Sequence, residues 1–138
     1  MTCYELYIIR IASFGSIPEL REILSSVMDE LEHPALLPIS VFEAKRVIEE
    51  AFEGVEDNGS TMNWLISWNN YQAEFSRSDS LDFTDFIKIT AGFKLSGEPE
   101  NVKRLIDIAF AIDASIFDTY TGLFHSEICD KAALETLS

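Results

Sequence analysis

The stretch FIKITAGFKL, residues 86–95, alternates apolar and polar residues more regularly than any other part of the chain. Apolar side chains recur at every second position, with lysine or threonine between most of them. The apolar positions are Ile87, Ile89, Ala91, Phe93 and Leu95. A period of two predicts a β-strand with one face toward a core and one toward solvent. The apolar face needs a covering layer, so we expect it to pack against helices.

Three other segments have the three- and four-residue spacing of a buried helical stripe. Two of them follow a capping-box pattern, Ser16-Ile17-Pro18-Glu19 and Ser40-Val41-Phe42-Glu43, and the third follows Glu98-Pro99-Glu100. The stripes are Ile17, Leu20, Ile23, Leu24, Val27, Met28 and Leu31, then Val41, Ala44, Val47, Ile48, Ala51 and Phe52, and then Val102, Leu105, Ile106, Ala109, Phe110 and Ile112. These stripes predict three helices with one buried side each.

The remaining apolar runs predict further strands. Residues 3–12 fit a first strand, residues 62–68 and 71–75 fit a hairpin across Asn69-Asn70, and residues 115–117 fit a short edge strand. Ser126 is a candidate cap for a short final helix. This order predicts an α+β fold in one domain, residues 1–138. We expect a two-layer sandwich with a mostly antiparallel sheet and helices packed on one face.

Charge is the strongest functional clue in the composition. The chain has 24 acidic and 10 basic residues, a net charge of -14, while its 47% hydrophobic content is high enough to fill a core. Such a surface repels nucleic acid phosphates and anionic lipids, so we expect no direct nucleic-acid binding and no membrane contact. A basic protein is the complementary partner.

The sequence contains no catalytic or metal-binding signature. The two cysteines, Cys3 and Cys129, are far apart, which favours free thiols and a cytoplasmic protein without a leader or membrane span. His125 and Cys129 suit a helix start, and Asp113 and Asp118 suit caps, better than they suit catalysis. The repeat of Asp79, Asp82 and Asp85 lacks the glycine and glutamate of a calcium loop and favours a solvated turn. We therefore expect no enzyme activity, no cofactor and no metal.

Two groups of residues are candidates for contact with a basic partner. The electrostatic candidates are Glu49, Glu50, Glu53, Glu56 and Asp57, which gather near the end of the second helix. We expect the negative side chains of the whole chain to be displayed as one coherent face rather than scattered around the fold. The aromatic candidates are Trp64, Trp68 and Tyr71, in the hairpin, where packing within the protein is the competing interpretation.

The segment AFAIDASIFDTYTG, residues 109–122, resembles the helix, short strand and D-x-x-T-G turn of small bacterial immunity proteins associated with toxins. This resemblance implies a bacterial or phage α+β protein that blocks the active surface of a toxin. The leading hypothesis is therefore an acidic immunity or inhibitor protein that occludes a basic effector, such as a nuclease. The alternatives are a phage-encoded nucleic-acid mimic that inhibits a host defence enzyme, and a small-molecule binding domain around His125, Asp113 and Asp118.

Overall fold

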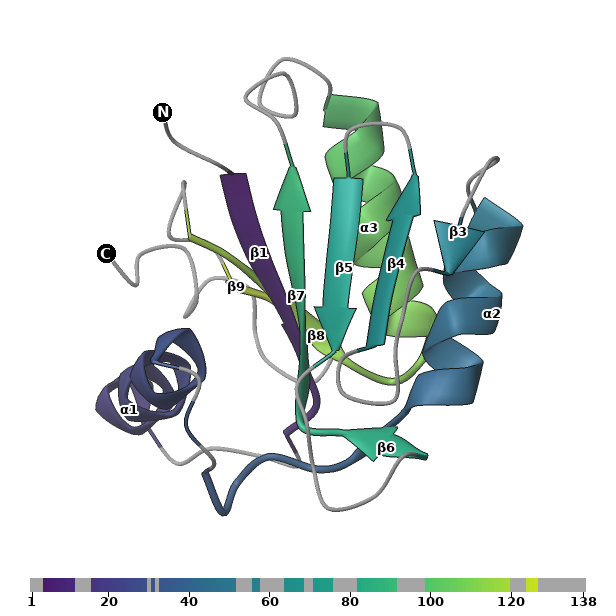
Figure 1. Cartoon of the computed structure of the whole chain (residues 1–138). Coiled ribbons are helices and arrows are strands. Elements are labelled where there is room, and N and C mark those ends of the chain that lie inside the picture. The colour runs from purple at the N-terminus through teal and green to yellow at the C-terminus, as the bar shows by residue number, and fades with distance from the viewer. Residues whose placement is uncertain are drawn as a thin grey trace.

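The computed structural model describes residues 4–11, 16–29, 31, 33–51, 56–57, 64–68, 71–75, 82–91, 99–119 and 124–126. Figure 1 shows a sheet with helices on both sides of it. In chain order the elements are β1 (Tyr4–Ile9), α1 (Ile17–Met28), β2 (Ile39–Ser40), α2 (Val41–Ala51), β3 (Glu56–Asp57), β4 (Trp64–Trp68), β5 (Tyr71–Phe75), β6 (Phe83–Thr84), β7 (Phe86–Ala91), α3 (Pro99–Ala111), β8 (Ser115–Asp118) and β9 (Phe124–His125).

The main sheet has the strand order β3-β4-β5-β7-β1-β8-β9, and each neighbouring pair is antiparallel. The strand with the regular alternation, β7, lies at the centre, where Ile89 is opposite Leu6 of β1 and Ala73 of β5. The expected hairpin is also present as β4 and β5. The predictions of an α+β fold and an antiparallel sheet are confirmed.

One face of the sheet is covered by α2 and α3, which form the expected helical layer. The predicted apolar face of β7 is confirmed for Ile87 and Ile89, which are fully buried in this core, while Phe93 and Leu95 lie outside the described residues. The core also takes alternate residues of β1 and β8 and the inward sides of both helices: Leu6, Ile8, Val41, Ala44, Ile48, Leu105, Ile108, Ala109 and Ile116. No helix among the described residues is long and apolar enough to cross a bilayer.

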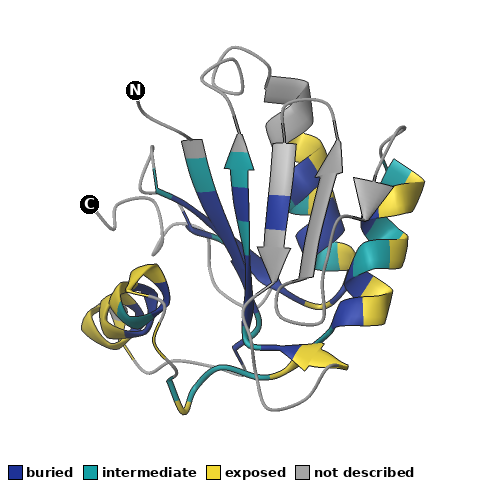
Figure 2. Cartoon of the chain, in the orientation of Figure 1, coloured by how far each residue is buried: buried dark blue, intermediate teal, exposed yellow. Residues whose placement is uncertain are grey.

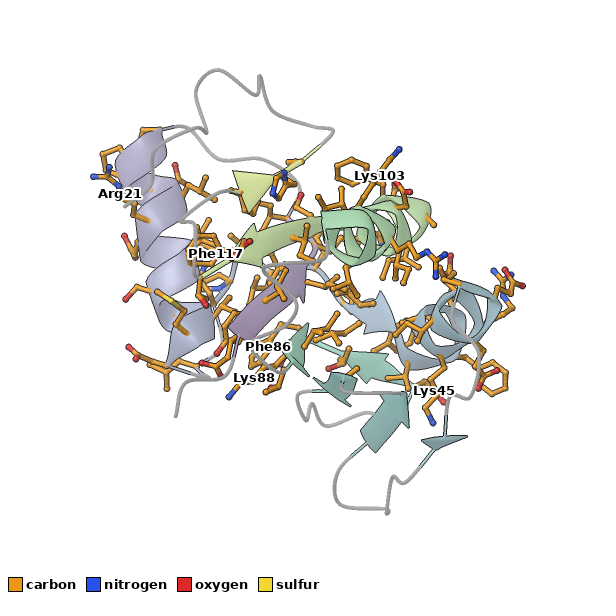
Figure 3. All side chains as sticks on the ribbon, turned by 90° about the horizontal axis from the view of Figure 1, so that it is seen from above. Arg21, Lys45, Phe86, Lys88, Lys103 and Phe117 are labelled. Atoms are coloured by element: carbon orange, nitrogen blue, oxygen red, sulfur yellow. The ribbon has the colours of Figure 1, made fainter. Side chains whose placement is uncertain are left out.

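The opposite face carries a second core beneath α1. Tyr7 and Ile9 of β1 alternate with Leu6 and Ile8 and are equally buried, so both faces of this strand are apolar. Phe86, Phe117 and Phe124 join the inward side of α1 there, and Figure 3 shows Phe117 pointing toward α1. The sheet is therefore covered on both faces, by α2 and α3 on one side and by α1 on the other, because neither side of β1 tolerates exposure to water.

The apolar stripe of α1 is shorter than the sequence predicted. The Ser16 hydroxyl accepts a hydrogen bond from the Glu19 amide (3.3 Å), as the cap pattern predicted, but the helix ends at Met28 with Asp29 as its C-cap. Met28 and Leu31 are exposed rather than buried. The prediction was wrong for these two residues: Met28 is the last residue of the helix, and Leu31 lies beyond the helix end, where the helical spacing no longer applies.

Two short pairings were not visible in the sequence. β9 pairs with β8, so residues 115–117 do not form the predicted edge strand; all four residues of β8 are buried between β1 and β9. β2 and β6 form a separate two-stranded ribbon at the start of α2. Each of these partners is two residues long, too short for a period of two to be recognised. The helix expected after Ser126 lies outside the described residues.

Candidate functional site

The acidic candidates that the structure describes lie on the outer side of α2. Val41, Ala44 and Ile48 fix the helix against the core, and this leaves Glu49 and Glu50 exposed. Figure 2 shows the resulting division of α2 into a buried and an exposed side. These two carboxylates are therefore held by a packed helix and point to solvent.

The other acidic candidates are placed less completely. Glu56 and Asp57 form β3, an edge strand in which they pair with Ser67 and Ile66 of β4. Their side chains, and the whole of Glu53, lie outside what the structure describes. Negative charge on an edge strand also discourages pairing with other chains, so this position has a structural explanation as well as a functional one.

One ion pair is present on the exposed side of α2. The Arg46 Nη1 atom lies 3.2 Å from the Glu50 Oε1 atom at the i, i+4 spacing, and both side chains are mostly exposed. Such a pair stabilises a helix by about 0.5 kcal/mol at most, so either side chain can turn to a partner at little cost.

Exposed carboxylates are not confined to this helix. Glu19, Glu22 and Asp29 are exposed on α1, which covers the opposite face of the sheet. The expectation of one coherent acidic face is therefore wrong for the described residues. Among the residues whose burial is described, the exposed side of α3 carries Lys103, Arg104 and Asp107, so the exposed acids lie mainly on α1 and α2.

The aromatic candidates Trp64, Trp68 and Tyr71 are placed by the backbone register alone. Trp68 of β4 is opposite Tyr71 of β5. Two residues away on each strand, Ile66 is opposite Ala73. Ala73 is fully buried in the core beneath α2 and α3. The three aromatic positions therefore belong to the same backbone alternation as Ala73. Their side chains lie outside the described part of the structure.

A polar cluster lies at the other end of the sheet, on β8 and β9. His125 is opposite Ile116, and Asp118 is opposite Leu6; both partners belong to the core beneath α2 and α3. His125 and Asp118 therefore share one face of the sheet. Burial lowers the pKa of His125 below its ordinary value of 6.5, and the Asp118 carboxylate partly offsets this by raising it.

His125 and the hydroxyl of the next residue, Ser126, lie on different faces of the sheet. The Ser115 hydroxyl donates a hydrogen bond to the Ser126 hydroxyl (2.8 Å), and Ser115 is opposite Ile9 on the face covered by α1. His125 and Ser126 thus lie on opposite faces of the sheet. They do not form the nucleophile and base pair that acyl transfer requires.

Asp113 does not join the polar cluster. It follows α3 with a φ of 60°, and the Ala114 and Asp113 amides donate to the Ala109 (2.8 Å) and Phe110 (3.1 Å) carbonyls, which is a Schellman ending. Its exposed carboxylate lies 3.8 Å from the Arg10 guanidinium. Asp113 and Asp118 stand at opposite ends of β8, so the structure does not support the proposed ligand site around His125, Asp113 and Asp118.

The described ranges contain no group of three or more side chains suited to a metal ion. Asp79 and both cysteines, Cys3 and Cys129, lie outside them. The His33 Nδ1 atom accepts a hydrogen bond from the Ala35 amide (3.0 Å), which is a structural role after the end of α1.

The stability of the fold is expected to fall below about pH 6.5 through His125. Because its pKa is lower in the folded state, the unfolded chain binds more protons as the pH falls from 6.5 through the folded value. Urea unfolding at about pH 7.5 and 5.5 should show a larger loss of stability for the wild type than for His125→Gln. His33→Gln is the control, and NMR titration of the imidazole at or above 6.5 would contradict the assignment.

Two exposed aromatic side chains were not predicted from the sequence. Phe42, in the first turn of α2, is 86% exposed, and Phe83 of β6 is 44% exposed. A signal for Phe42 was present, because position 42 falls outside the stripe that begins with Val41 and Ala44. No such signal existed for Phe83, whose exposure depends on the two-residue pairing of β6.

Neither a protein-family model, nor a curated protein sequence, nor a solved structure matches this chain.

Proposed function

We propose that this protein is an immunity or inhibitor protein that binds a basic protein effector, such as a nuclease, and occludes its active surface. The observation that carries the proposal is the net charge of -14 on a chain whose described acids include Glu49 and Glu50, exposed on a helix packed into the core. A rigid acidic surface attracts a basic partner over long distances and binds it without first having to become ordered.

The distribution of charge over several elements is compatible with this role. Long-range steering depends on the summed field of the protein rather than on one patch. The exposed acids of α1 and α2 add to the same field, whereas specificity needs a smaller surface with its own shape and apolar contacts.

The proposal is tested by recovering the partner and measuring its activity. The full chain, immobilised, is expected to retain a basic protein from an extract of its own cells at moderate salt, and mass spectrometry identifies it. The activity of the purified partner should then fall to near zero when the two proteins are mixed in equal amounts. Full activity of the partner in an excess of this protein would reject an inhibitory role.

A further inference from the structure

We propose that Phe42 and Phe83 form the apolar centre of the surface that binds the partner, and that they receive a basic segment carrying arginine and aliphatic side chains. This inference rests on the function proposed above and gives it a location. The surface, called here the Phe42–Phe83 patch, comprises these two residues with Ser40, Glu43 and Asp82.

The β2–β6 ribbon turns Phe83 outward. Ile39 and Thr84 are opposite each other and both are buried, so the next pair, Ser40 and Phe83, lies on the outer side of the ribbon. The Thr84 hydroxyl donates to the Phe86 carbonyl (3.0 Å), which ties the ribbon to the start of β7. Phe83 is thus exposed by a fixed backbone geometry.

The start of α2 holds Phe42 beside this ribbon. The Val41 amide donates to the Asp82 carbonyl (3.0 Å), which joins the first residue of the helix to the residue before Phe83. The Ser40 hydroxyl accepts from the Glu43 amide (3.2 Å) and caps the helix. Val41 is buried, whereas Phe42, the next residue of the same capped turn, is exposed.

Phe42 and Phe83 are the exposed phenylalanines among those whose side chains the structure describes. Phe86, Phe117 and Phe124 are buried beneath α1, and Phe110 is partly buried. Single exposed apolar residues are common on protein surfaces, but these two aromatic residues lie on elements that are joined by a hydrogen bond, and aromatic anchors are enriched at the centre of interfaces.

The acidic residues around the patch favour a basic partner. The ionisable residues of α2 and of the β6 region are five acids, Glu43, Glu49, Glu50, Asp82 and Asp85, and two bases, Lys45 and Arg46. Arg46 is paired with Glu50. An arginine can stack on an aromatic face while its guanidinium approaches a neighbouring carboxylate, so a basic segment satisfies both features of the patch. A second copy of this chain would instead bring two acidic rims together.

The test uses the full chain, labelled for NMR, and a twelve-residue peptide of alternating arginine and leucine as the probe. The amide signals of residues 40–43 and 82–84 are expected to shift during the titration. Phe42→Ala should weaken binding about tenfold or more. Met28→Ala is the matched control, because Met28 is an exposed apolar residue on α1, and it should leave the affinity within about twofold.

Two further arms separate the outcomes. A peptide of alternating arginine and glycine carries the same charge without apolar side chains, and its weaker binding should be insensitive to Phe42→Ala. If the arginine–leucine peptide binds with equal affinity to Phe42→Ala, or shifts signals on α1 instead, the patch is wrong while the electrostatic role of the protein stands. If neither peptide binds, the proposed function fails too.

The wild-type titration map needs no variant, so it decides the location even if Phe42→Ala were unstable. Sedimentation of the protein alone should show a monomer. A dimer that dissociates in Phe42→Ala would show that a second copy occupies the patch, and this would overturn the assignment to a basic partner.

Discussion

Ile9→Ala is expected to lower the free energy of unfolding by about 2–5 kcal/mol, as much as Ile8→Ala does. Both side chains are fully buried, Ile8 in the core beneath α2 and α3 and Ile9 in the core beneath α1. Truncating either side chain leaves a cavity and loses the free energy that is gained when its apolar surface is buried away from water. The measurement is urea unfolding of the three proteins, followed by far-UV circular dichroism.

The comparison tests whether α1 covers the second face of the sheet. If α1 did not cover it, Ile9 would face water and its truncation would cost less than about 1 kcal/mol, while Ile8→Ala would still be severe. Phe42→Ala serves as the surface control and should change the stability by no more than about 0.5 kcal/mol. A mild effect of Ile9→Ala beside a severe effect of Ile8→Ala would therefore refute the two-core description.

The elements with a long, regular pattern were predictable from the sequence. β7 was recognised from alternation alone, and α2 from its cap and stripe, because each pattern repeats often enough to exclude the other type of structure. The sequence of β1 reads YELYII, in which four successive apolar residues follow Glu5. Such a run is typical of a strand that is buried on both faces, as β1 is.

Features that depend on contacts between distant residues were not predictable. The burial of β8 comes from pairing with Phe124 and His125, and the exposure of Phe83 comes from pairing with Ser40. A strand of two residues is too short to show an alternating pattern in the sequence. Likewise, the sequence pattern predicted that Glu49 and Glu50 are exposed. It did not predict that further exposed acids lie on α1, on the other side of the sheet.

Reversing two acids of α2, Glu49→Lys with Glu50→Lys, is expected to slow association with the basic partner by about tenfold or more at low ionic strength. The protein should remain folded, because both residues are exposed and lie in the last turn of α2, where positive charge interacts favourably with the helix dipole. Stopped-flow mixing with the purified partner gives the association rate, and the dissociation rate should change less.

The matched control is Glu22→Lys with Asp29→Lys on α1. Each substitution changes the charge by two, so both double variants carry -10 in place of -14. Each also removes one contact of an exposed carboxylate, that of Glu50 with Arg46 Nη1 (3.2 Å) in the first case and that of Glu22 with His33 Nε2 (3.7 Å) in the second. The two variants therefore differ in the position of the reversed charges rather than in their number.

The position of the charges separates general attraction from a defined docking surface. If the partner docks against α2, the α2 variant should slow association several-fold more than the α1 variant, since charges beyond about 10 Å from the partner are largely screened at 0.1 M salt. At about 0.5 M salt the two variants should converge on the wild-type rate. Equal slowing by both variants would mean that only the net field attracts the partner, and the contact surface would then have to lie away from Glu49 and Glu50.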